Sequence, residues 1–130
     1  MDHQGRTDLH YAACECDLAK VRTLLALGAQ VDTPDDNGWT PLHFAAQAHA
    51  VAIVETLLAA GASVDSRDLR GNTPLINAVF NSRGRGDLIT LLRRHGADPT
   101  IKNAHGVSPV TLARSIGNFE VKQCFSDLPE

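Results

Sequence analysis

The stretch "NGWTPLHFAAQAHAVAIVETLLAAGASVD", residues 37–65, recurs in outline on both sides of itself. Gly38 opens it, Gly5 opens the similar "GRTDLHYAAC" before it, and Gly71 opens "GNTPLINAVF" after it. These three glycines are evenly spaced along the sequence, and Gly106 follows at nearly the same interval. A fixed period of this length is typical of solenoids, in which thin units stack and bury one continuous core.

A second series of glycines has the same spacing. Gly28, Gly61 and Gly96, each followed by alanine, mark the same points of successive units. In both series the last interval is slightly longer than the one before it, so a short insertion lies between Gly71 and Gly96. The segment "NSRGRGD", residues 81–87, falls in this interval and predicts a longer loop between the two helices of the third unit.

Each unit carries the signals of two helices. Thr40 followed by Pro41 predicts a helix start, because threonine caps the first amides and proline in the first turn loses no hydrogen bond. After a polar break, apolar residues at Val51 and three, six and seven positions later form the stripe of a second helix. Gly61 suits the left-handed end of that helix. The stretch that follows predicts an extended, hairpin-like finger.

Composition limits the class of protein. The chain has 130 residues, 43% apolar and 21% charged, which is ordinary for a single globular domain. The formal charge of -3 argues against a nucleic-acid partner. Absence of a long apolar run predicts no membrane partner, and the amino-terminal stretch predicts no secretory signal. Cysteines 14, 16 and 124 stand in no disulfide spacing, so we expect a cytoplasmic protein.

The residues "NGWTPLHFAA" and "IVETLLAAGASVD" closely resemble the ankyrin repeat, whose pattern is G-x-T-P-L-H-x-A-A followed by a leucine-rich helix and G-A-D. The resemblance extends roughly over residues 4–126. It implies an all-α repeat solenoid of helix-turn-helix units with β-hairpin fingers, in a single domain over residues 1–130. Three clear repeats and a degenerate carboxy-terminal capping repeat are expected, with approximate bounds 4–36, 37–70, 71–105 and 106–128.

The motif histidine departs from the family pattern in the second half. His10 and His43 keep it, whereas Ile76 and Thr111 replace it, so the imidazole network between layers should be incomplete there. His10 also precedes Cys14 by one helical turn, which places both on one helical face and would suit an activated thiol. The resemblance instead implies that this histidine bonds the threonine of its own motif.

No catalytic, cofactor or metal site is predicted. Cys14 and Cys16 supply half of a zinc site, and no other pair completes it. No serine or carboxylate pair stands in a recognisable catalytic context. We therefore expect a binding protein without enzymatic activity.

The resemblance implies that a partner protein contacts a concave wall formed by finger tips and first helices. Trp39 is the leading candidate because aromatic residues dominate binding hot spots. Packing against the neighbouring finger is the alternative for Trp39, and Phe80 has the same ambiguity. Carried over by position, the predicted partner-binding residues are Arg6, Glu15, Asp36, Asn37, Trp39, Gln47, Leu69, Arg70, Asn72, Phe80, Asn81 and His105.

Charge is uneven along the sequence. Residues 1–36 carry a net charge of -4 and residues 37–66 a net -2, whereas residues 67–102 carry a net +4 and residues 103–130 a net -1. A solenoid converts sequence into distance, so the stack should be acidic in its first half and basic in its third layer. This polarity would orient a complementary partner. Alternatively, these charges pair internally, such as those at positions 65 and 68 with those at 67 and 70.

The ending at residues 70–125 looks like that of small stand-alone bacterial ankyrin proteins thought to be immunity partners of polymorphic toxins. This resemblance implies a monomer that binds a toxin domain tightly and blocks it. The alternative is a regulatory adaptor that joins two proteins, and an enzyme with an unrecognised site is the third interpretation.

Overall fold

The computed structural model describes residues 4–129, and within them it forms eight short helices in four pairs. The helices are α1 (Asp8–Cys14), α2 (Leu18–Ala26), α3 (Pro41–Gln47), α4 (Val51–Ala59), α5 (Pro74–Phe80), α6 (Asp87–Arg94), α7 (Pro109–Ile116) and α8 (Phe119–Gln123).

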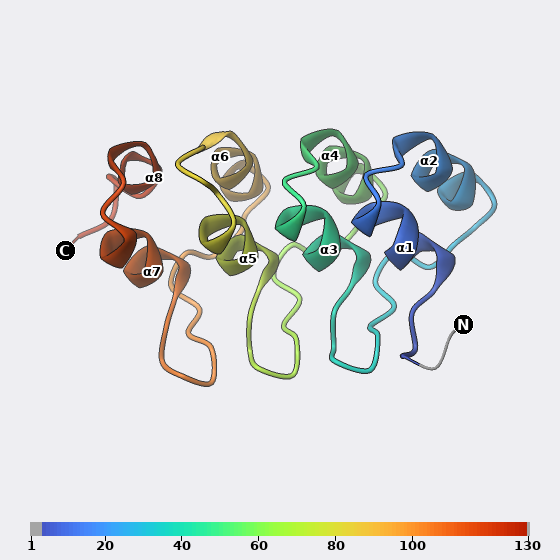
Figure 1. The fold of residues 1–130 in the computed structure, drawn as a ribbon, viewed down its shortest axis with the longest axis horizontal. Helices are drawn as coiled ribbons and strands as arrows, with labels where there is room; N and C mark the ends of the chain where they lie inside the picture. Colours follow the sequence, from blue (N-terminus) through green and yellow to red (C-terminus); the bar gives the residue numbers. More distant parts are fainter. Residues whose placement is uncertain (1–3, 130) are drawn as a thin grey trace.

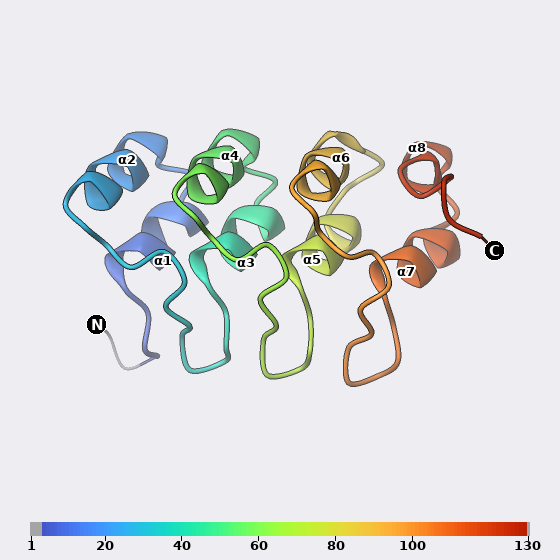
Figure 2. The ribbon, with the colours of Figure 1, turned by 180° about the vertical axis from the view of Figure 1, so that it is seen from behind.

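The helices lie in two layers along an elongated stack (Figure 1). The first helices of the pairs, α1, α3, α5 and α7, form one layer in which each contacts the next. The second helices, α2, α4, α6 and α8, form the other layer, and long loops project from the opposite side of the first layer (Figure 2). The chain advances from one end to the other, so the predicted all-α repeat fold is confirmed and sequence position maps onto distance along the stack. Each of the four expected units holds one helix pair.

The helix starts follow from the predicted caps. The Thr40 side chain accepts a hydrogen bond from the amide of His43, and Pro41 is the first helical residue of α3. The pairs at residues 73–74 and 108–109 repeat this arrangement. At the other end of the unit, Gly61 follows α4 with a φ of 94°, a left-handed conformation that glycine adopts without strain.

The core lies between the two helical layers. Leu42, Leu57 and Leu75 are among its fully buried side chains. Alanines 45 and 46 of α3 are also fully buried, and their small side chains allow α1 and α5 to approach closely. Burying one leucine stabilises a fold by about 1.5–3 kcal/mol, so the stacked units are held together by many such contributions.

The long loops are here called fingers and numbered by the unit whose first helix they precede, so residues 27–40 form the second finger, residues 60–73 the third and residues 95–108 the fourth. They contain no strand within residues 4–129, so the expected β-hairpins are not confirmed. Each finger is closed by a tight turn instead. In the second finger, the Asp35 amide donates to the Trp39 carbonyl at 2.8 Å, and the Gly38 amide donates to the Asp35 carbonyl at 2.9 Å. The second and third fingers are joined by the Leu69 amide, which donates to the Asn37 carbonyl at 3.0 Å. A single link of this kind is too short for a β ladder.

The predicted longer loop is present in the third unit. Residues 81–86 connect α5 to α6, whereas residues 48–50 connect α3 to α4. The loop reaches the last unit, because a Cβ added at Gly84 would lie 2.9 Å from the side-chain nitrogen of Asn118.

The last unit is fastened to the stack by packing and by arginines. Val121 and Phe125 are buried against the third unit's side of the core. Arg93 donates two hydrogen bonds to the Asp127 carboxylate, at 2.7 and 2.9 Å, and Arg114 donates to the Pro129 carbonyl at 2.9 Å. The segment after α8 is therefore held by two arginines from two units.

A strained turn between α1 and α2 gives a first prediction. Cys16 is exposed and has a φ of 59°, a left-handed value that costs a residue with a Cβ about 1–2 kcal/mol. Cys16→Gly is expected to raise the free energy of unfolding by about 1 kcal/mol, measured by urea denaturation followed by circular dichroism. Cys16→Ala removes the thiol but keeps the Cβ, so its stability should match the parent; equal gains in both variants would contradict the strain argument.

Candidate partner-binding site

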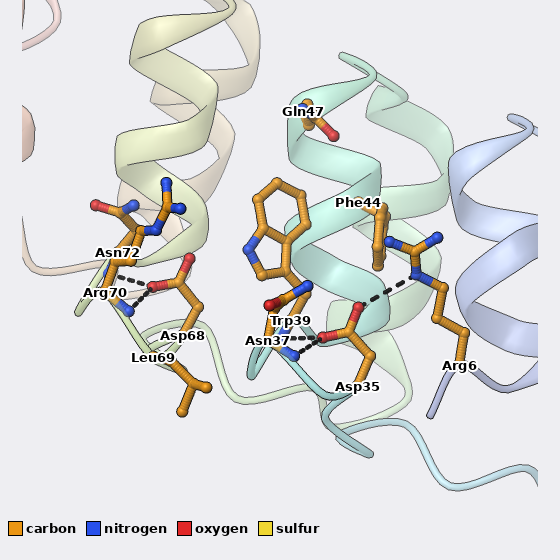
Figure 3. Close-up of a pocket in the computed structure, with 10 residues that line it drawn as sticks. All are labelled: Arg6, Asp35, Asn37, Trp39, Phe44, Gln47, Asp68, Leu69, Arg70 and Asn72. Atoms are coloured by element: carbon orange, nitrogen blue, oxygen red, sulfur yellow. Dashed lines mark hydrogen bonds and ion pairs between the residues drawn. The ribbon is translucent and has the colours of Figure 1, made fainter. Parts of the chain in front are cut away.

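A hollow of about 350 Å³ lies between the second and third fingers, beside α3 (Figure 3). One wall comes from the second finger and α3, and the other from the third finger. Its lining residues are Arg6, Asp35, Asn37, Trp39, Phe44, Gln47, Asp68, Leu69, Arg70 and Asn72.

The hollow brings together seven of the predicted partner-binding residues: Arg6, Asn37, Trp39, Gln47, Leu69, Arg70 and Asn72. The other five lie outside its lining: Glu15, Asp36, Phe80, Asn81 and His105. Among these, Phe80 is 73% exposed at the end of α5, and Asn81 donates a side-chain hydrogen bond to the Asn77 carbonyl at 3.0 Å. Glu15, Asp36 and His105 are exposed.

Trp39 lies along α3 rather than at the tip of its finger (Figure 3). Its ring centroid is 4.8 Å from that of Phe44 and 5.6 Å from that of His43. This packing is against α3 and not against the neighbouring finger, and Trp39 is only half-buried and also faces the hollow. Its role as a binding hot spot stays a prediction.

Asp35, which the sequence reasoning missed, closes the second finger. Its Oδ1 accepts hydrogen bonds from the amides of Asn37 and Trp39, both at 2.9 Å. Its Oδ2 accepts from Arg6 Nε at 3.3 Å, and the Arg6 guanidinium carbon lies 5.2 Å from the centroid of the Phe44 ring. This carboxylate is thus satisfied within the protein.

Asp68 closes the third finger in the same way. Its Oδ1 accepts from the amides of Arg70 at 2.9 Å and Asn72 at 2.8 Å (Figure 3). Asp35 and Asp68 occupy the same place before the finger glycines Gly38 and Gly71, so the period of the repeat was the signal that could have found both.

The family model described as Ankyrin repeats (3 copies) matches residues 9–103. The chain belongs to the ankyrin-repeat family. The match covers most of the first three units, and α7 and α8 lie beyond it. Comparison with curated proteins finds no match. Ankyrin repeats are protein–protein interaction modules, so the hollow lies on the surface of such a module.

The ankyrin histidines are used by the scaffold. His10 Nε2 donates to the Trp39 carbonyl at 2.8 Å, and His43 Nε2 donates to the Asn72 carbonyl at 2.9 Å, because a carbonyl oxygen can only accept. Ile76 has no such bond, so the network ends after the second unit, as predicted. Each histidine therefore links one ankyrin unit to the next.

The alternative of a Cys14 thiol activated by His10 has no support from this geometry. The second ring nitrogen of His10, Nδ1, accepts a hydrogen bond from the Thr7 amide at 2.9 Å. Both nitrogens of His10 are thus engaged by the ankyrin scaffold, and Cys14 is exposed. Residues 4–129 also bring together no group of three metal-binding side chains. None of the helices described is long and apolar enough to cross a membrane.

Proposed function

We propose that this ankyrin-repeat chain holds a partner protein over the hollow between the second and third fingers, and that the partner is a toxin domain whose activity it blocks. The choice of the hollow as the binding surface rests on the side chains that line it. Leu69 is 76% exposed, Trp39 is half-buried, and the Arg70 guanidinium forms no hydrogen bond or ion pair with any residue of 4–129. An exposed apolar residue, an aromatic ring and an arginine are the elements of a hot spot.

The charge polarity supports the same proposal. The pairings considered for positions 65 and 68 with 67 and 70 do not form within the described chain, because Arg67 donates to the Lys102 carbonyl at 2.8 Å and Asp65 accepts from the Asp98 amide at 3.1 Å. Arg93 does pair with Asp127, but neither residue lines the hollow. Asp68 accepts from backbone amides, and the Arg70 guanidinium has no partner among residues 4–129. The hollow therefore lies where the acidic first half meets the basic third layer, which would orient a partner carrying both signs.

The toxin partner is supported by the resemblance to small bacterial ankyrin proteins of toxin systems. Such a protein acts as a cytoplasmic monomer, and the fourth unit serves as its cap. In that unit, Glu120, Lys122 and Gln123 face outward from α8, which suits a terminal repeat that meets water.

A regulatory adaptor is the second candidate, favoured by a separate exposed surface. Phe119 is 74% exposed at the start of α8, in the helical layer farther from the fingers. An adaptor would use the hollow for one protein and this surface for another.

Affinity purification from the native cell, with partners identified by mass, tests the proposal. Immunity requires one partner bound with a nanomolar dissociation constant, which corresponds to a binding free energy of about 12 kcal/mol. An adaptor would instead bind several partners with micromolar dissociation constants. The double variant Trp39→Ala with Arg70→Glu is expected to weaken a captured partner at least about a hundredfold. Lys20→Ala, on α2, is the control and should leave affinity unchanged.

Two results would overturn the proposal. Unaltered partner affinity in a folded double variant would show that another surface is used. Harmless deletion of the protein, beside an intact and active toxin gene, would eliminate the immunity role.

A further inference from the structure

The repeat supplies an internal reference for the third finger. In the second finger, Asp35 Oδ1 holds the backbone turn and Asp35 Oδ2 binds Arg6. The guanidinium of Arg6 in turn lies over the ring of Phe44. Carboxylate, cation and aromatic ring thus form a complete arrangement within the protein.

One unit further on, the cation is missing. Asp68 is the equivalent of Asp35 in the next repeat and holds its turn through Oδ1, but the position equivalent to Arg6 is Trp39. No hydrogen bond or ion pair joins Asp68 Oδ2 to any residue of 4–129. Asp68 is only 7% exposed, and Figure 3 shows this second oxygen turned away from the turn amides, toward the space beside Trp39.

In the fourth finger the equivalent residue is Asn103, an amide that closes the turn without a carboxylate or a cation. Asn103 Oδ1 accepts from the amides of His105 at 2.9 Å and Val107 at 3.0 Å, which is the same turn closure. Its Nδ2 donates to Asn72 Oδ1 at 2.9 Å, so both ends of the amide are bonded. Among these three finger side chains, the Asp68 carboxylate alone keeps an oxygen without a partner in the described residues.

A partner that covers the hollow must deal with this oxygen. Covering a carboxylate further without a partner is costly, so an apolar or acidic group there would oppose binding. A guanidinium would satisfy the oxygen with a charge-assisted hydrogen bond, and its flat face would lie against the indole beside it.

We propose that the hollow receives an arginine side chain of the partner protein, whose guanidinium pairs with Asp68 Oδ2 and lies against Trp39. This inference rests on the proposed function and names the chemistry of the partner at its centre. Arg70 lies on the same third-finger wall as Asp68, where its like charge opposes the incoming arginine, although it can still pair with an acidic group of a partner that carries both signs. The site therefore has an attractive and a repulsive residue that can be altered separately.

The test uses N-acetyl-arginine amide as the probe and needs no identified partner. Trp39 is the single tryptophan of the chain, so the indole N–H gives one resonance that reports directly on the hollow. We expect a saturable shift of this resonance, with a dissociation constant of about 10 mM or lower. N-acetyl-citrulline amide, which has nearly the same shape without the charge, should cause no saturable shift.

Three variants make the test specific. Asp68→Asn is expected to weaken probe binding at least about tenfold while keeping the fold, because asparagine closes the fourth finger in the same way. Glu55→Gln changes the net charge equally at an exposed residue of α4, outside the hollow, and should leave binding unchanged. Arg70→Gln removes the like charge and should strengthen binding by about twofold or more.

The inference is overturned by absence of a saturable shift, by an equal shift with the citrulline probe, or by probe binding that survives Asp68→Asn in a folded protein. Its failure is distinguishable from failure of the proposed function. If a captured partner loses affinity when Trp39 and Arg70 are changed but the arginine probe does not bind, only the proposal of an arginine side chain in the hollow is rejected. If the probe binds but the affinity of the captured partner is unchanged in the variants of Trp39 and Arg70, the proposal that the partner binds over the hollow is rejected.

Discussion

Replacement of Gly38 by alanine is expected to lower the free energy of unfolding by about 3 kcal/mol or more. Two costs combine at this turn of the second finger. Gly38 has a φ of 79°, and an added Cβ would lie 2.9 Å from the Leu69 amide nitrogen and 3.0 Å from Asp68 Cα. Those atoms are backbone of the third finger, so the clash cannot be relieved by rotating a side chain.

Gly106→Ala is the matched control for this prediction. Gly106 occupies the same turn in the fourth finger with a φ of 76°, but a Cβ there would meet nothing within 4 Å. Only the conformational cost remains, and we expect a loss of about 1 kcal/mol. Urea denaturation of both variants measures the difference. Similar losses would mean that the second and third fingers separate freely, and the hollow between them would then lack a fixed shape.

The fold could be predicted because each unit repeats strong local signals. Thr40 and Pro41 specify where α3 begins, and Gly61 follows the end of α4. These signals act through the backbone over a few residues, so they are visible in the sequence. Their recurrence at a fixed interval then indicates stacking, since no single unit can bury its own apolar side.

The fingers could not be predicted in the same way. A run such as residues 62–72 suits a hairpin. Whether two segments form strands, however, depends on how many backbone N–H and C=O groups come within hydrogen-bond distance of each other, both within a finger and between neighbouring fingers. The turn at Asp68 and Gly71 uses the nearest amides, and one amide, that of Leu69, reaches the neighbouring finger. The local sequence sets the turn, but spacing between units decides that no ladder forms.

The candidate site was predicted in part for a related reason. Trp39, Leu69 and Arg70 belong to positions that the family resemblance assigns to the binding face, and the structure places them around one hollow. Asp68 was missed because its sequence context marks it only as a turn residue. Its unpartnered oxygen becomes apparent when the third finger is compared with Asp35 and Arg6 in the second.

Replacement of His43 by alanine is expected to cost about 3 kcal/mol near neutral pH. His43 is fully buried, and three interactions are lost together. Nδ1 accepts from the Thr40 amide at 3.1 Å, Nε2 donates to the Asn72 carbonyl at 2.9 Å, and the ring packs against Trp39. The variant leaves a buried cavity beside Trp39 and leaves the Asn72 carbonyl with one fewer partner.

The cost of His43→Ala should shrink as the pH falls. Burial lowers the pKa of His43 below its ordinary value of 6.5, although the Asn72 carbonyl and the charges of Asp68 and Asp35 oppose this. Below pH 6.5 the unfolded chain takes up a proton that the folded chain still refuses, so the parent loses stability as the pH falls toward the folded-state pKa. Protonation of this one group can change the parent's free energy of unfolding by at most about 1.4 kcal/mol per pH unit.

Urea denaturation of the parent and of His43→Ala between pH 7.5 and pH 5, about the range over which an unfolded histidine titrates, measures how the difference between their free energies of unfolding narrows. The alanine variant has no imidazole at this position, so its own stability should fall less steeply than that of the parent. His105→Ala, at an exposed position, is the control and should show neither the initial loss nor the narrowing. If the gap between parent and His43→Ala instead widened at low pH, the folded protein would be binding the proton, and a neutral imidazole that links the second and third ankyrin units would be the wrong description.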